Sequence, residues 1–125
     1  MSQDTRIGRI MVPVRDQDAG IDFYRQTLGF ELVADVPFGE GDRWVEVAPP
    51  GGAATLSLVP ARDHYDAGRM TGIALDTADA RAAYDDLKAA GVDVDAELMG
   101  GDGVVPLLFF FRDHDGNTLM IVESS

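Results

Sequence analysis

The alternation of apolar and polar residues predicts a strand, a helix and three further strands in the N-terminal half of the chain. Residues 10–14 place an apolar side chain at every second position, as in a strand with one buried face. A helix is expected next, because Asp16 or Asp18 can cap its start and Gly29 stands where a left-handed C-cap belongs. Segments rich in proline and glycine then separate three short strands, expected at residues 30–36, 43–48 and 54–59.

The same order of elements recurs in the C-terminal half. A strand is expected at residues 71–76, followed by a helix that Thr77 or Asp79 can cap and that Gly91 ends. Further strands are expected at residues 92–98, 107–112 and 118–123. A repeat of about 60 residues that occurs twice is not a solenoid, and neither copy could close a core alone.

We therefore predict an α+β fold of two βαβββ modules, with eight mostly antiparallel strands curled around a cleft and one helix per module. The chain, residues 1–125, is expected to form a single domain. Module one should cover about residues 6–60 and module two about residues 70–123, joined by a linker at about residues 61–69.

Composition and charge exclude several classes of function. The 22 acidic residues against 10 basic ones give a net charge of −12, which should repel the phosphates of a nucleic acid. No apolar run approaches the roughly 20 residues of a membrane helix, and the first residues lack the layout of a signal peptide. The absence of cysteine excludes disulfides and thiolate chemistry. A cytoplasmic protein is the expected class.

Four short motifs carry a resemblance to a known family. They are Val-Arg-Asp at residues 14–16, Phe-Tyr at 23–24, Leu-Gly-Phe-Glu-Leu at 28–32 and Asp-His-Asp-Gly-Asn at 113–117. Together they resemble the glyoxalase, bleomycin-resistance and extradiol dioxygenase proteins, the vicinal oxygen chelate superfamily, over nearly the whole chain. The resemblance implies a glyoxalase-like fold, and a homodimer, since single-domain members commonly pair.

The metal site of that family has no usable donors in this sequence. The resemblance places the four ligand positions at Arg9, Ser57, Gly72 and Met120. Arginine is a fixed cation, glycine has no side chain, and a thioether suits hard divalent ions poorly. Ser57 is at best a weak ligand. We therefore expect no metal and no other cofactor.

A ligand-binding face is expected on the side of the strands that the helices do not cover. Strand parity places Arg9 and Met11 opposite the apolar residues of the first strand, and it gives corresponding positions on the other strands. The phenylalanine run at residues 109–111 puts at least one aromatic ring on each face. The candidate ligand-binding residues are Arg9, Met11, Trp44, Glu46, Ser57, Gly72, Phe109, Phe111 and Met120.

The two histidines have simple structural interpretations. His64 falls in the expected linker, where a solvated loop residue is the simplest interpretation, and His114 falls in an expected hairpin turn.

An arginine in the pocket favours a ligand with an acceptor oxygen, unless Glu46 or Asp76 already pairs with the Arg9 guanidinium.

The sequence thus favours a metal-free protein that binds or sequesters a small, partly apolar organic molecule. One alternative is an enzyme of the same superfamily, of lyase, isomerase or dioxygenase type. Such an enzyme would use Glu46 or His64 without a metal, or would hold a metal at displaced ligands. A second alternative is a module that binds a protein partner.

Overall fold

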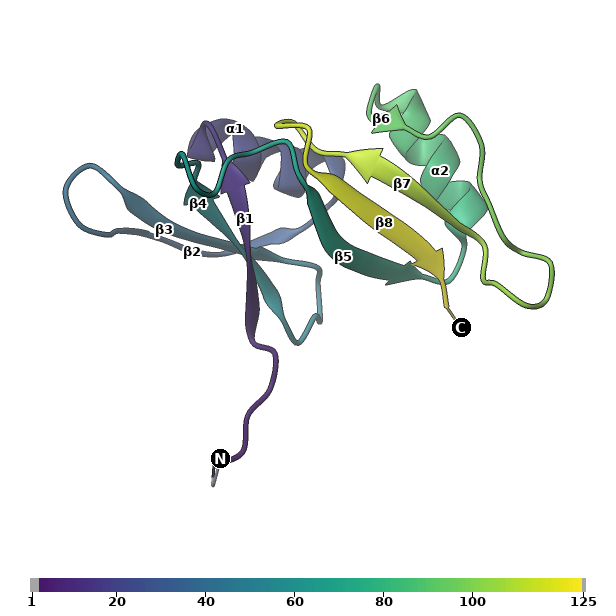
Figure 1. Cartoon of the computed structure of the whole chain (residues 1–125), viewed down its shortest axis with the longest axis horizontal. Helices are drawn as coiled ribbons and strands as arrows, with labels where there is room; N and C mark the ends of the chain where they lie inside the picture. The colour runs from purple at the N-terminus through teal and green to yellow at the C-terminus, as the bar shows by residue number, and fades with distance from the viewer. Residues whose placement is uncertain (1–2, 125) are drawn as a thin grey trace. The chain divides into compact units, whose positions relative to one another are not determined.

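The computed structural model describes residues 3–124, and the chain divides into two compact units, Met1–Ala67 and Gly68–Ser125. Each unit contains one α-helix and four strands (Figure 1). The first unit consists of β1 (Arg9–Val14), α1 (Gln17–Asp22), a π-helical turn (Phe23–Thr27), β2 (Glu31–Pro37), β3 (Arg43–Ala48) and β4 (Thr55–Pro60). The second consists of β5 (Met70–Thr77), α2 (Ala80–Ala89), β6 (Asp93–Val94), β7 (Leu108–Arg112) and β8 (Thr118–Glu123).

The two sheets have the same topology. The strand order is β1-β4-β3-β2 in the first sheet and β5-β8-β7-β6 in the second. In each sheet the first and last strands of the module pair in parallel, and the other pairs are antiparallel. The prediction of an α+β fold with two βαβββ modules and eight mostly antiparallel strands is confirmed.

The core of the first unit follows the alternation seen in the sequence. Val12 and Val14 on β1 and Leu58 on β4 are almost fully buried under the helix. The helix lies close to the sheet at Gly20, where a Cβ atom would meet Val14 Cγ1 at 3.3 Å and Leu58 Cδ1 at 3.4 Å. A larger residue at this position would push α1 away from the strands.

The helix termini agree with the capping prediction in part. Asp16 accepts a hydrogen bond from the Ala19 amide at 3.1 Å, and Asp79 accepts one from the Ala82 amide at 3.0 Å. Of the candidate caps, Asp16 and Asp79 are therefore the N-caps. Gly29 has a φ of 75°, which is the left-handed conformation expected just beyond the helical segment. The sequence did not indicate that this segment ends in a π-helical turn.

The strand expected at residues 92–98 is much shorter than predicted. The Phe110 amide donates to the side chain of Asp95 at 3.1 Å, and the Tyr84 hydroxyl donates to the carbonyls of Asp95 and Ala96 at 2.7 and 2.9 Å. These side chains take the hydrogen bonds that a continued strand would use. Pairing resumes only at a single bridge between Met99 and Leu108.

Within residues 3–124, no helix is long and apolar enough to span a membrane.

Candidate functional site

The uncovered face of the first sheet carries all five candidate residues of module one. Met11 on β1 pairs with Ser57 on β4, and Ser57 pairs with Glu46 on β3, so the three form one row across the sheet. Arg9 and Trp44 lie two residues from Met11 and Glu46 along their strands and therefore face the same side. The strand parity expected from the sequence holds on β1, β3 and β4.

Glu46 is the buried polar centre of this face. It is 8% exposed; its Oε1 accepts a hydrogen bond from the Thr55 hydroxyl at 2.6 Å, and its Oε2 accepts one from Trp44 Nε1 at 2.6 Å. Arg9 Nε lies 3.6 Å from Oε2. The hydrogen bond from Thr55, then that from Trp44, and the charge of Arg9 hold the pKa of Glu46 below its ordinary value, although desolvation opposes them.

This arrangement makes Glu46 a poor general base. Both oxygens already accept short hydrogen bonds, and a lowered pKa weakens the affinity of the carboxylate for a proton. Glu46 also pairs with the Arg9 guanidinium, so Arg9 is not the free cation that the sequence analysis considered. The Arg9 side chain nevertheless remains 58% exposed, so its charge is shared and still accessible.

Ser57 lies beside Glu46 and is fully buried. Its Oγ has no hydrogen-bond partner among residues 3–124. A buried hydroxyl without a partner lowers the stability of the fold by about 1–3 kcal/mol. The Ser57 hydroxyl therefore does not stabilise the core.

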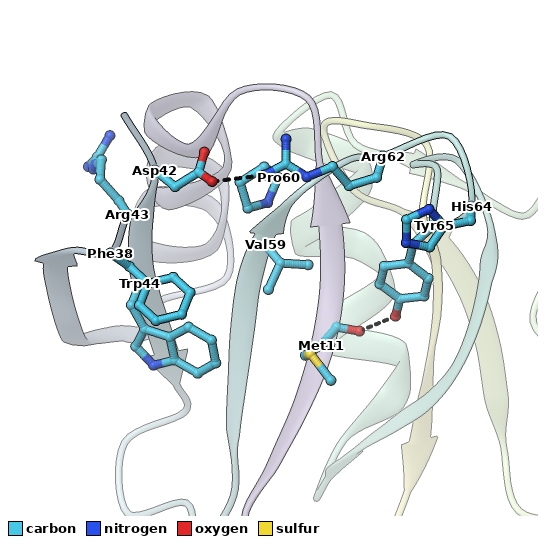
Figure 2. A pocket seen from close by; sticks show the side chains of 10 residues that line it. All are labelled: Met11, Phe38, Asp42, Arg43, Trp44, Val59, Pro60, Arg62, His64 and Tyr65. Atoms are coloured by element: carbon cyan, nitrogen blue, oxygen red, sulfur yellow. Dashed lines mark hydrogen bonds and ion pairs between the residues drawn. The ribbon is translucent and has the colours of Figure 1, made fainter. Parts of the chain in front are cut away.

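An apolar hollow opens at the other end of the same face. It has a volume of about 500 Å³ and is lined by Met11, Phe38, Asp42, Arg43, Trp44, Val59, Pro60, Arg62, His64 and Tyr65 (Figure 2). The Phe38 and Trp44 rings meet edge to face, with centroids 5.7 Å apart at 64°. Phe38 is 62% exposed and Met11 55% exposed, so much of the wall is apolar surface facing solvent.

The segment after β4 closes one side of the apolar hollow. Tyr65 donates a hydrogen bond from its hydroxyl to the Met11 carbonyl at 2.7 Å, which holds its ring against β1 (Figure 2). Arg62 pairs with Asp42 at 2.8 Å, and this contact joins the segment to the β2–β3 turn. His64 also lines the hollow and is exposed.

Sequence reasoning named only Met11 and Trp44 among the residues of this hollow as ligand-binding. Val59 also lines the hollow and lies two residues from Ser57 on β4, so it faces the same side. Phe38 and Tyr65 lie in a turn and in the segment between the modules, where no alternation fixes the direction of a side chain. One signal in the sequence could have indicated Phe38. It is an aromatic residue in the glycine-rich turn at residues 37–41, where a side chain is not expected to pack in the core.

Among the four candidates of module two, Met120 lies on one face of its sheet, and Phe109 and Phe111 lie on the other. Met120 pairs with Ala74 and with Phe110, so these three share one face. Phe109 and Phe111 are instead fully buried, and Phe109 packs edge to face on Tyr84 of α2 with centroids 5.1 Å apart. The pairing of β7 with β8 puts Phe110 on the uncovered face, which is the reverse of the parity expected for this run.

Gly72 has a backbone reason for being glycine. Its φ is 76°, and the pairing of β5 with β8 shifts register between Met70 and Ala74. A residue with a side chain would be strained at this φ. A bulge in β5 therefore explains the glycine at this position, and no role in ligand binding is needed to explain it.

The residues at the four metal-ligand positions of the resembled family do not fit a divalent ion. Arg9 is bound to Glu46, Gly72 offers no donor, and Met120 offers only a thioether. Among residues 3–124, no group of three histidine, aspartate or glutamate side chains is placed to hold a metal.

The second histidine belongs to a structural turn. The Asp113 amide donates to the Asn117 carbonyl at 2.8 Å, which closes the hairpin between β7 and β8. The fully buried Asn117 side chain accepts hydrogen bonds from the amides of Gly68 and Arg69 at 2.9 and 3.2 Å. The acidic turn thus anchors the start of the second unit, and His114 is a half-exposed member of it.

Comparison with known proteins agrees with this fold. The model of the Glyoxalase/Bleomycin resistance protein/Dioxygenase superfamily matches residues 6–121. One similar protein of known crystal structure is TnmS3, an antibiotic binding protein from Streptomyces sp. CB03234. Its sequence is 35% identical to this chain, and the two structures superpose with a TM-score of 0.85 over 100% of this chain and 99% of TnmS3. A superfamily member from Sphaerobacter thermophilus DSM 20745 is 32% identical with a TM-score of 0.88, covering 97% and 98% of the two chains.

A relative from a third organism shows the same full-length match. YetH of Bacillus subtilis (strain 168) is 31% identical over 121 residues, which cover 94% of this chain and 98% of YetH. The family match spans both modules, and the strand order repeats in each of them. The chain belongs to the Glyoxalase/Bleomycin resistance protein/Dioxygenase superfamily.

Proposed function

We propose that the protein binds a small, partly apolar organic molecule in the apolar hollow of the first module, and that it does so without a metal. The observation that carries this proposal is the exposed apolar wall formed by Met11, Phe38 and Trp44 around a volume of about 500 Å³. Ligand pockets commonly have volumes of about 300–1,000 Å³ with a mostly apolar lining and a few polar groups. The similarity to TnmS3, an antibiotic binding protein, supports the same class of function.

A screen that follows Trp44 tests the proposal directly. Trp44 is the only tryptophan in the chain, so its fluorescence reports on this wall. Neutral aromatic compounds of low molecular mass should change the emission in a saturable way. Phe38→Ala should weaken the hits about threefold to tenfold, because one aromatic contact contributes about 0.5–1.5 kcal/mol.

A matched variant separates loss of the wall from a general effect. Val104 is 87% exposed, apolar and outside the hollow, so Val104→Ala should leave the affinities unchanged. If the hits lose as much affinity in Val104→Ala as in Phe38→Ala, or if no compound binds, the proposal is wrong.

The metal-free part of the proposal has its own measurement. Elemental analysis of the purified protein after dialysis should find no stoichiometric Ni, Zn, Fe or Mn, because the four expected positions lack suitable donors. One tightly held ion per chain would contradict this part.

The position of His64 gives a second candidate function, a metal-free enzyme. His64 lines the apolar hollow, and a neutral imidazole is the usual general base near neutral pH. Prolonged incubation of each hit with the protein, followed by mass spectrometry, should reveal a product that His64→Gln no longer forms. Binding without any conversion supports the sequestering function instead.

We further propose that the protein acts as a homodimer in the cytoplasm. Each four-stranded sheet ends in edge strands, β1 and β2 in the first and β5 and β6 in the second, and such edges favour pairing.

A further inference from the structure

A second, polar hollow lies on the same face of the first sheet. Its volume is about 760 Å³, and its charged lining residues are Arg6, Arg9 and Glu46. The segment of residues 5–8 before β1 forms one wall, and Thr55 on β4 contributes to another. We call it the polar hollow, as distinct from the apolar hollow around Trp44.

The polar hollow concentrates positive charge in a strongly acidic protein. Glu46 balances one of the two guanidinium groups, through the 3.6 Å contact with Arg9 Nε. Arg6 forms no ion pair with a carboxylate among residues 3–124. One positive charge therefore remains, which a single carboxylate would neutralise.

The other arginines of the first module near this sheet are already engaged. Arg43 is held by Asp18 and Asp35, each at 2.8 Å. Arg62 is held by Asp42 at 2.8 Å. Arg43 and Arg62 together face three carboxylates, so neither is a free positive charge beside the apolar hollow, and the residual positive charge lies at the polar hollow.

Two strands join the polar hollow to the apolar one. On β1, Arg9 lines the polar hollow and Met11 lines the apolar hollow; on β3, Glu46 and Trp44 do the same. Residues two apart on a strand lie about 7 Å from each other on one face. The Trp44 indole, hydrogen-bonded to Glu46 at 2.6 Å, is the direct link between the two hollows.

We infer that the ligand class of this protein is an aromatic monocarboxylic acid, with its ring against Met11 and Trp44 and its carboxylate at Arg6 and Arg9. The inference rests on the proposed function and goes further by naming the charged group. Glu46 holds Arg9 in place from one side, at Nε, and the exposed remainder of the guanidinium is available to the ligand. The overall charge of −12 opposes an anion only weakly, since charges beyond about 8 Å are largely screened at physiological salt.

A matched series of three probes tests the charge of the ligand. We choose 4-phenylbutyrate, 4-phenylbutyramide and 4-phenylbutylamine, which share a ring and chain and differ in carrying a negative, a neutral or a positive group. Binding is followed by the Trp44 indole N–H signal in ¹H–¹⁵N spectra, a single resonance. The acid should bind about fivefold more tightly than the amide, the upper range for partly exposed ion pairs, and the amine should bind most weakly.

Three variants assign the effect to the polar hollow. Arg6→Gln and Arg9→Gln should each remove most of the preference for the acid over the amide. Arg25→Gln makes the same charge change on an exposed residue outside both hollows and should keep the preference. Arg6 lies before β1 and outside every strand, so Arg6→Gln stays informative even if Arg9→Gln disturbs Glu46.

The outcomes separate this inference from the proposed function. Equal binding of acid and amide, with both weakened by Phe38→Ala, overturns the inference and leaves the apolar hollow as the binding site. Tightest binding of the amine also overturns it, as does an equal loss in Arg25→Gln. If no member of the series or of the neutral screen binds, both proposals fail.

Discussion

Replacing Glu46 by glutamine tests the network at the centre of the uncovered face. Glutamine keeps the shape of glutamate and can place its carbonyl oxygen toward the Trp44 N–H, which only donates. Its amide nitrogen then faces the Thr55 hydroxyl, which can turn and accept a hydrogen bond. The variant therefore removes the charge while each polar atom keeps a partner.

The expected cost follows from the two hydrogen bonds at 2.6 Å. Hydrogen bonds to a charged group contribute about 1.5–3 kcal/mol each and neutral ones about 0.5–1.5 kcal/mol. The exchange of two such bonds should thus lower the free energy of unfolding by about 2–3 kcal/mol, to which the loss of the weak contact with the exposed Arg9 adds little. With an m-value of about 2 kcal/mol/M, the urea midpoint should fall by about 1–1.5 M.

The difference between the wild type and Glu46→Gln should depend on pH. Because the pKa of Glu46 is lowered in the folded protein, its charge stabilises the fold fully above the ordinary glutamate pKa of about 4.3. That stabilisation is lost as the pH falls through the folded pKa. The two proteins should therefore differ most at pH 6–8 and converge in acid.

Urea unfolding followed by far-UV circular dichroism measures this difference without relying on Trp44, whose emission the variant itself changes. Glu31→Gln is the control, since Glu31 lies exposed on β2 of the same sheet. A loss in Glu46→Gln no larger than in Glu31→Gln, or a gap that widens in acid, would refute the reasoning.

Three further predictions concern the fold and assembly. Asn117→Ala should lower the free energy of unfolding by about 2–4 kcal/mol, measured by urea unfolding, because the Gly68 and Arg69 amides lose this acceptor and Asp113 Oδ2 loses one donor; His114→Ala in the same turn should cost far less. Asp79→Ala should cost about 1 kcal/mol through loss of the N-cap of α2, with the exposed Asp85→Ala as its control in thermal unfolding. Light scattering should report twice the chain mass of 13.4 kDa, and a persistent monomer would contradict the proposed dimer.

The fold could be predicted from the sequence because periodicity and capping agree with each other. The ranges expected at residues 43–48 and 118–123 coincide with β3 and β8, and the N-caps at Asp16 and Asp79 mark both helices. A strand was expected around β6, but its short length could not be predicted, because the side chain of Asp95 takes a hydrogen bond that the pattern assigns to a longer strand.

The candidate site was predictable only where a strand fixes the direction of its side chains. On β1, β3 and β4 the alternation is clear, and the expected residues share one face. In the phenylalanine run of β7 both faces are apolar, so only the pairing with β8 decides which ring points under α2. Phe38 and Tyr65 reach the apolar hollow through a turn and an ion-paired segment, which periodicity does not describe.

The most direct test of small-molecule binding in the apolar hollow uses the methionine methyl groups. The chain has five methionines; Met11 lines the apolar hollow, whereas Met70 and Met99 lie outside it and serve as internal references. With ¹³C-methyl methionine, titration with the strongest hit of the Trp44 screen should shift the Met11 signal and give intermolecular NOEs from Met11 to the ligand. A ligand that leaves Met11 unchanged while shifting Met70 or Met99 would show that the hollow around Trp44 is not the binding site.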